Sequence, residues 1–311
     1  MILDHVDRVS VVVPCFNAEK YIEETLASVL AQTRPPDEII VVDDGSTDES
    51  AAIAEGLGRR IRVVRQANAG ESRARNRGID EATGDWVAFL DSDDVWMPDK
   101  LSRQLQACAS TPDVICCHTG VTFDFDGTLV AHETAPELEA GDYSVANMLL
   151  RFMVHPSSAI VRRSSPARFA EWTRDGEDLL YFADLSRLGS FLYLPEPLVR
   201  YRKHTASQSA DPSNIVRNRA SCLQWLDMNS AGLSPAEIEA LRMLLLEDLV
   251  DRMRVFKWQR AWDRYWPIRR FLEDHLGDRP GPADLRERIW PPVVYRFKDR
   301  FDRWTARRWG S

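Results

Sequence analysis

Three carboxylates directly after an apolar run are the clearest chemical signal in the chain. Residues 86–90 read Trp-Val-Ala-Phe-Leu, and Asp91, Asp93 and Asp94 follow at once. Such a run predicts a buried strand of a parallel sheet, whose carboxyl end faces a ligand crevice. Carboxylates gathered there suit Mg²⁺ or Mn²⁺, which bridges to substrate phosphates. The alternative is a solvated acidic turn before a helix that begins near Pro98.

Two further polar clusters also follow apolar runs. Asp43 and Asp44 end the run 38–42, where a carboxylate can accept hydrogen bonds from a nucleobase or ribose. A helix-capping turn explains the residues after them well but explains the paired aspartates less well. Arg73 and Arg75 stand near the start of a predicted helix, where phosphates also bind. The alternative for these arginines is an ordinary solvated helix face.

The first 110 residues predict a scaffold that brings these groups together. Apolar or β-branched runs predict strands at 9–13, 38–42, 61–64 and 86–90. Capping residues and helical apolar spacing predict helices at about 18–32, after Ser46 or Thr47, and at about 71–82. Strand and helix therefore alternate four times, which is typical of an α/β fold with a Rossmann-like, mostly parallel central sheet and helices on both faces.

The pattern changes after Cys117. Residues 121–125 and 128–132 flank Asp126-Gly127, a dipeptide typical of a two-residue β-hairpin turn. Further on, the sequence predicts a strand at 158–161, a helix near 178–188 and a strand at 191–194. From about residue 213 the sequence is helical.

Composition indicates a soluble globular protein, with 44% hydrophobic and 28% charged residues among 311. We find no run of eighteen apolar residues and no secretory signal. The five cysteines are odd in number and show no Cys-x-x-Cys spacing, so a reduced, cytoplasmic chain is expected. Cys116 and Cys117 are neighbours on a predicted strand and should point to opposite faces.

The C-terminal part differs in charge from the rest. Residues 251–311 hold 16 basic against 9 acidic side chains, and six of the ten tryptophans, although the whole chain has a net charge of −8. Within it, residues 293–309 alternate aromatic and basic residues. A helix of this kind can lie on an anionic membrane. It can equally pack its aromatic side chains against the rest of the protein.

Seven short motifs, in this order and spacing, resemble the family-two glycosyltransferases of GT-A fold. They lie at 11–17, 42–48, 74–78, 91–93, 155–158, 176–178 and 194–204, so the resemblance covers about residues 8–205. It implies metal-dependent transfer of one sugar from a nucleotide-sugar donor to a hydroxyl acceptor, with inversion at the anomeric carbon. The implied metal is Mn²⁺ or Mg²⁺.

The resemblance also assigns residues. Those matched to the nucleoside are Pro14, Asn17, Asp43, Asp44 and Arg75. Asp91 is matched to the ribose or sugar, Asp93 to the metal, and His204 to the metal or the diphosphate.

Inversion in one displacement requires a base on the face opposite the leaving group. We expect Asp178 to be that base, with Glu177 as the second choice. The alternative for both is favourable charge at a helix start.

Processive members carry Gln-x-x-Arg-Trp, which we do not find, so addition of a single residue is expected. Residues 1–110 are expected to bind the nucleotide sugar, residues 111–212 to form the acceptor half of the same domain, and residues 213–311 to form a helical extension. Family analogy suggests assembly of a cell-surface glycan on a lipid-linked or other hydroxyl acceptor, at the inner face of the cell membrane. Nucleic acid is not expected as a partner. Peripheral membrane contact would involve residues 293–309.

The sequence also leaves two other functions open. Residues 123–130 resemble the first motif of haloacid-dehalogenase-type phosphatases, in which Asp124 would be the nucleophile and Asp126 the acid/base. A β-hairpin explains the same Asp-Gly without any chemistry. A catalytically dead protein that only binds nucleotide sugars is disfavoured, because Asp93, Asp178 and Arg75 are all present.

Overall fold

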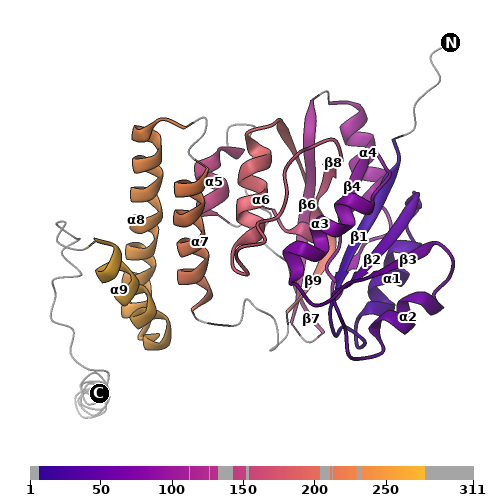
Figure 1. The fold of residues 1–311 in the computed structure, drawn as a ribbon, viewed down its shortest axis with the longest axis horizontal. Helices are drawn as coiled ribbons and strands as arrows, with labels where there is room; N and C mark the ends of the chain where they lie inside the picture. Colours follow the sequence, from indigo (N-terminus) through magenta and orange to yellow (C-terminus); the bar gives the residue numbers. More distant parts are fainter. Residues whose placement is uncertain are drawn as a thin grey trace, which may run out of the picture.

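A nine-stranded sheet runs through the described part of the chain, and helices cover both of its faces (Figure 1). The computed structural model describes residues 7–111, 113–125, 127–131, 143–151, 154–203, 211, 213–229 and 233–276. The strand order is β3-β2-β1-β4-β8-β6-β9-β5, and β7 pairs with β6. The strands are β1 (Val9–Cys15), β2 (Glu38–Asp43), β3 (Ile61–Arg65), β4 (Trp86–Phe89), β5 (Val95–Trp96), β6 (Val114–Phe125), β7 (Thr128–Ala131), β8 (Ile160–Arg162) and β9 (Ser190–Lys203).

The predicted parallel sheet is confirmed for the first four strands. β1 lies between β2 and β4, and β2 pairs with β3, all in parallel. The register places Cys15 beside Asp43, and Val12 beside Phe89. The carboxyl ends of β1, β2 and β4 therefore meet at one edge of the sheet, where the polar motifs follow.

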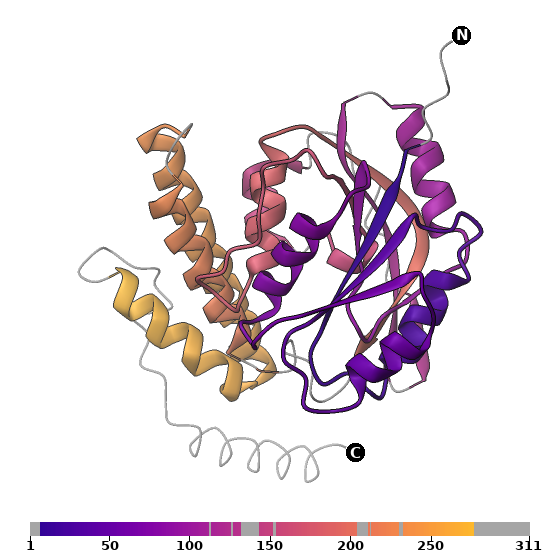
Figure 2. The same cartoon turned by 45° about the vertical axis from the view of Figure 1, so that its right-hand side comes forward.

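Helices cover both faces because the strands are apolar on both. Val12 of β1 packs in one core cluster with Ala74 and Ile79, whereas Val11 and Val13 pack in the other. The helices of this half are α1 (Ile22–Leu30), α2 (Ser50–Gly56), α3 (Glu71–Glu81) and α4 (Lys100–Ala109). α3 covers the first face, and residues of α1, α2 and α4 join the second cluster. Figure 2 shows α3 and α1 on opposite sides of the strands.

The second half of the sheet is mixed. β8 is antiparallel to both β4 and β6, and β6 runs parallel to β9 over most of their length. The predicted hairpin is confirmed, since β6 and β7 are antiparallel with Asp124 beside Leu129. This half also carries α5 (Val145–Leu150), the short 3₁₀ helix η2 (Pro156–Ser158) and α6 (Glu177–Ser186). Cys116 and Cys117 of β6 enter opposite core clusters, as expected, and all five cysteines are free thiols.

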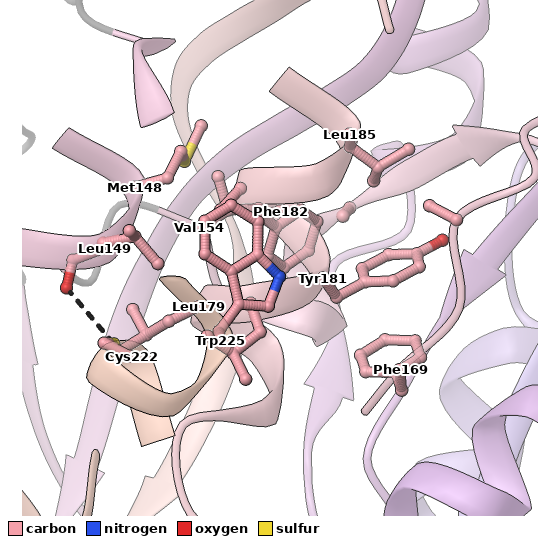
Figure 3. Packing of buried hydrophobic residues seen from close by; sticks show 14 of the residues in the cluster. Met148, Leu149, Val154, Phe169, Leu179, Tyr181, Phe182, Leu185, Cys222 and Trp225 are labelled. Atoms are coloured by element: carbon pink, nitrogen blue, oxygen red, sulfur yellow. Dashed lines mark hydrogen bonds between the residues drawn. The ribbon is translucent and has the colours of Figure 1, made fainter. Parts of the chain in front are cut away.

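The helical C-terminal region is confirmed as far as Leu276. It consists of α7 (Asn214–Met228), α8 (Pro235–Gln259) and α9 (Trp262–Leu276), and Figure 1 shows it beside α5 and α6. In Figure 3, Trp225 of α7 packs among Val154, Leu179 and Phe182, which extends the core of the sheet into this region. No helix among the described residues is long and apolar enough to span a membrane.

Candidate active site

The loops after β1 and β2 bind each other at the carboxyl edge of the sheet. Asn17 has a positive φ of 49°, and its backbone N–H donates to Ser46 Oγ at 3.0 Å. Its side-chain Oδ1 accepts from the Thr47 N–H at 2.8 Å. The left-handed backbone suits asparagine, which adopts it more readily than most residues. Asn17 therefore joins the two loops that follow β1 and β2, and Pro14 lies one residue before the end of β1.

Asp43 and Asp44 are both buried, and they make different contacts. Asp43 Oδ1 accepts from the Ser46 N–H at 3.0 Å. Asp44 Oδ1 accepts from Gln66 Nε2 at 2.7 Å, and its Oδ2 accepts from the Gly70 N–H at 2.8 Å. Asp44 thus holds the loop that leads into α3. It is a structural residue of the edge in addition to any contact with a nucleoside.

Arg75 is the buried cation of the site. It lies on α3 with only 3% of its side chain exposed, and its Nη2 binds both Glu71 and Asp91, the latter at 2.7 Å. Nη1 lies 3.6 Å from Glu177 Oε1, and the guanidinium stands 5.0 Å from the centre of the Phe169 ring. The solvated helix face considered for Arg75 is therefore wrong. One guanidinium gathers carboxylates from α3, from the loop after β4 and from α6.

The acidic turn after β4 is folded back on itself. The Asp94 N–H donates to the Asp91 carbonyl oxygen at 3.1 Å. Asp94 is completely buried, while Asp91 and Asp93 are only partly so. Burial, with repulsion from Asp91 and Asp93, raises the pKa of Asp94 well above its usual range. The turn is therefore not a freely solvated acidic loop.

Glu177 and Asp178 begin α6 and face the same cluster. Gly176 precedes them with φ 74°, a conformation that glycine adopts without strain. Burial and the Asp178 charge raise the pKa of Glu177 to about 7. Burial raises the pKa of Asp178 to about 7 as well, although Arg75 opposes that shift. A carboxylate with such a pKa can accept a proton near neutral pH.

Sequence reasoning missed Glu71, which stands one helical turn before Arg75. Burial of its charged form, with repulsion from Asp91 and Glu177, raises the pKa of Glu71 to about 8 despite the attraction of Arg75. The spacing of four residues between Glu71 and Arg75 was the available signal, because such pairs meet on a helix. The spacing indicates only this pair, because Asp91 and Glu177, which repel Glu71, are distant from it in the sequence.

The cluster contains more carboxyl groups than cations. Glu71, Asp91, Asp93, Glu177 and Asp178 affect one another electrostatically, and Arg75 is the cation at their centre. This surplus of carboxylates suits a divalent cation. No three His, Cys, Asp or Glu side chains of the described residues stand in a ready-made metal site. His204, the other expected ligand, lies outside the described residues.

Asp124 of the alternative phosphatase motif serves the hairpin. It is buried, and its Oδ1 accepts from the Gly127 N–H at 2.7 Å. Its Oδ2 lies 3.6 Å from Arg200 Nε. Asp126 lies outside the described residues. The contacts of Asp124 agree with the hairpin explanation of this motif.

Comparison with known proteins identifies the family. The family model described as Glycosyl transferase family 2 matches residues 10–167, which include the loops after β1, β2 and β4. The chain belongs to glycosyltransferase family 2. A family member is an enzyme that transfers a sugar, so the phosphatase and pure binding functions give way to glycosyl transfer.

Several relatives resemble the chain over most of its length. TuaG of Bacillus subtilis (strain 168), whose name refers to teichuronic acid biosynthesis, is 49% identical over 250 residues, covering 76% of this chain and 90% of TuaG. An uncharacterized glycosyltransferase of Nostoc sp. is 33% identical over 291 residues, covering 85% of this chain and 88% of the relative. The fold matches residues 1–349 of S. aureus TarS in complex with UDP-GlcNAc, with a TM-score of 0.66 at 21% identity, over 86% of this chain and 81% of that one. These matches confirm the expected GT-A fold.

Proposed function

We propose that this family-two enzyme is a metal-dependent, inverting, non-processive glycosyltransferase that moves one sugar from a nucleotide-sugar donor to a hydroxyl acceptor. The carboxylate cluster around Arg75 carries the proposal. It lies at the edge where β1, β2 and β4 end, which is where open α/β sheets bind nucleotides. The TarS structure of the same fold contains UDP-GlcNAc, and this supports a nucleotide-sugar donor here.

In this proposal, the donor nucleoside lies against Pro14, Asn17 and Asp43. Asn17 stands in the loop after β1, and Asp43 is the last residue of β2; Ser46 and Thr47, in the loop after β2, bind both of them. Asp44 supports the next loop from behind and holds its backbone N–H groups in place. These hydrogen bonds hold the loops in place without a donor, which would reduce the entropy lost on binding.

Asp178 is the proposed base, and Glu177 supports it. Asp178 accepts the proton of the acceptor hydroxyl as that oxygen attacks the anomeric carbon. Attack from the face opposite the departing diphosphate inverts the configuration at that carbon. Two buried donor nitrogens of Arg75, Nε and Nη1, make no hydrogen bond to the described residues. The positive charge of Arg75 keeps Asp91 and Glu177 in place.

Departure of the diphosphate builds negative charge on its oxygens. Asp91 and Asp93, together with His204, are the residues proposed to hold Mn²⁺ or Mg²⁺, which would stabilise that charge when bound. The chemistry of the donor set fits, because carboxylate oxygens suit both ions.

The setting is proposed from relatives. The match to TuaG supports assembly of a cell-surface glycan, with a lipid-linked or other hydroxyl acceptor. A cytoplasmic location, with membrane contact through residues 293–309, stays a prediction, because those residues lie outside the described part of the chain. We also propose that residues 1–110 bind the donor and that residues 111–212 bind the acceptor.

Product analysis tests this function. The enzyme is incubated with Mn²⁺ and UDP-, GDP-, CDP- or dTDP-sugars, and release of nucleoside diphosphate is measured with hydroxyl acceptors and with water alone. We expect release from one nucleotide class, loss of at least about 100-fold in Asp178→Asn, and an inverted anomeric centre by NMR. Asp184→Asn, on the same helix but outside the cluster, is the matched control and should remain active. A product with retained configuration would contradict the mechanism.

A further inference from the structure

One buried hydroxyl group joins both ends of the acidic turn. Ser157 Oγ accepts the Asp91 N–H at 3.1 Å and donates to Asp94 Oδ2 at 2.5 Å. Ser157 itself is 0% exposed and belongs to η2, which is far from the turn in sequence. Since Asp91 begins the turn and Asp94 ends it, Ser157 fixes the loop on which Asp93 stands.

The other oxygen of Asp94 reaches a third element. Asp94 Oδ1 accepts the backbone N–H of Arg202 at 2.9 Å, near the end of β9. Both carboxylate oxygens are thus used within the protein, and Asp94 is 0% exposed. Asp94 therefore differs from Asp91 and Asp93, which are the more accessible carboxylates of the turn. It ties the turn to the end of β9.

Ser157 is in turn held by a buried polar network. Its carbonyl oxygen accepts from Trp96 Nε1 at 2.8 Å. The next carbonyl, of Ser158, accepts from Gln104 Nε2 at 2.9 Å, and Gln104 Oε1 accepts from Lys100 Nζ at 2.9 Å. Buried networks with satisfied partners rigidify the structure around them. These hydrogen bonds therefore hold η2 in a fixed position beside the turn.

We propose that Ser157 and Asp94 are positioning residues that set the metal affinity of the acidic turn without touching metal or substrate. The proposal rests on the proposed function, in which Asp91 and Asp93 hold the metal. Removing a group that orients metal ligands commonly lowers the affinity for the metal about 10- to 100-fold. Ser157 and Asp94 occupy such a place here, because Ser157 Oγ binds both ends of the turn and Asp94 joins the turn to β9.

The chain contains a matched control for Ser157. Ser10 is also 0% exposed, its Oγ donates to Glu38 Oε1 at 2.6 Å, and it accepts the Gly84 N–H at 2.8 Å. It therefore makes the same pair of hydrogen bonds at a place remote from the acidic turn. Ser157→Ala and Ser10→Ala should lower the melting temperature by similar amounts. Any effect on metal binding that comes only from lost stability should therefore appear in both variants.

The experiment measures binding of UDP, GDP, CDP and dTDP by calorimetry across a Mn²⁺ series, with Mn²⁺ binding followed by electron paramagnetic resonance. For Ser157→Ala we expect the half-saturating Mn²⁺ concentration to rise about tenfold or more. Ser10→Ala should keep the value of the unmodified protein. An unchanged value in Ser157→Ala, or an equal change in both variants, would overturn the proposal.

Asp94→Asn separates positioning from direct ligation. The amide oxygen can still accept from the Arg202 N–H, and the amide nitrogen can donate to Ser157 Oγ. Asp94→Asn should therefore bind Mn²⁺ nearly as the unmodified protein does, while Asp93→Asn loses it. Equal loss in both variants would make Asp94 a ligand and overturn the positioning role. If the unmodified protein binds none of the four nucleotides, the proposed function fails first, and this inference fails with it.

Discussion

Arg75 illustrates how a single side chain organises the site. Its guanidinium lies among Glu71, Asp91 and Glu177, which come from three separate elements. Taking these charges out of water is costly unless they are paired, and removal of one partner leaves the others uncompensated. Asp178, which stands at the edge of this group, is the residue whose ionisation decides the proposed chemistry.

The first prediction concerns the pH dependence of transfer. The pKa of Asp178 is raised to about 7, mainly by burial, and a base acts only when it is deprotonated. We therefore expect kcat/KM to rise as the pH increases to about 7 and then to level off. Initial rates between about pH 5 and pH 9 would show this limb. A rate that is already maximal near pH 5 would contradict the role of Asp178 as the base.

The same carboxylates predict how stability changes with pH. Folding raises the pKa values of Glu71, Glu177 and Asp178 from their ordinary values of 4.5, 4.5 and 3.8 to about 8, 7 and 7, mainly because burial disfavours the charged forms. The folded protein therefore binds more protons than the unfolded chain between about pH 4 and pH 8. Stability gained from these groups is present at low pH and is lost as the pH rises through about 7.

Urea unfolding of the metal-free and nucleotide-free protein at a series of pH values checks this second prediction. The part of the unfolding free energy that depends on these groups should fall as the pH rises from about 4 to about 8 and should change little above that. Glu71→Gln, which removes one repelling charge, should flatten the fall. Stability that falls equally steeply in Glu71→Gln would show that other groups cause it.

At the scale of elements, the fit of α3 against β1 places Arg75 in the cluster. Gly78 lies one turn after Arg75, and a Cβ added there would stand 2.2 Å from Val12 Cγ1. No side chain fits between the helix and the strand, so α3 can approach β1 closely only with glycine at this position. The motif that contains Gly78 is thus a packing requirement as well as a signature.

Gly78→Ala is the third prediction. The overpacked contact should destabilise the protein by about 1–3 kcal/mol and move Arg75 away from Asp91. Gly56→Ala is the control, because a Cβ at Gly56 meets nothing within 4 Å. Urea unfolding of both variants measures the difference. A Gly78→Ala variant as stable as the unmodified protein would contradict this account of the helix–strand contact.

The elements also show which features a sequence can reveal. The alternation of strands and helices up to β4 was predictable, since apolar runs and helical spacing are local patterns. The insertion of β8 between β4 and β6 was not predictable, because strand partners distant in sequence leave no local pattern. The full length of β9 was missed for a related reason. It contains Pro195 and Pro197, which interrupt a strand pattern, and its register with β6 shifts nearby.

The same distinction applies to the site. Local motifs predicted several residues of the candidate site, because their types and spacing are visible in the sequence: Asp43, Asp44, Arg75 and the acidic turn. The hydrogen bond between Ser157 and Asp94 was not predictable, because the two residues are 63 positions apart in the sequence and only the folded sheet brings them together. Glu71 was missed for the same reason.

For the molecule as a whole, Asp124 distinguishes glycosyl transfer from phosphatase chemistry. A phosphatase would need Asp124 as its nucleophile, whereas a glycosyltransferase would not. Its carboxylate is bound to the Gly127 N–H and lies near Arg200, so it holds the β6–β7 hairpin. As the fourth prediction, Asp124→Asn should keep sugar transfer, since the amide oxygen can still accept the Gly127 N–H. Release of phosphate from a phosphomonoester by the unmodified protein, absent in Asp124→Asn, would contradict this.

The proposed function requires that the protein bind a nucleotide sugar through a metal at the acidic turn. Thermal unfolding with UDP-, GDP-, CDP- and dTDP-sugars, each with and without Mn²⁺, measures this binding. A ligand at about 100 times its Kd stabilises the folded state by about 2.7 kcal/mol. We predict a rise in melting temperature with one nucleotide class, dependent on Mn²⁺ and lost in Asp93→Ala. A folded protein that no nucleotide sugar stabilises, or an equal rise in Asp93→Ala, would contradict the proposed function.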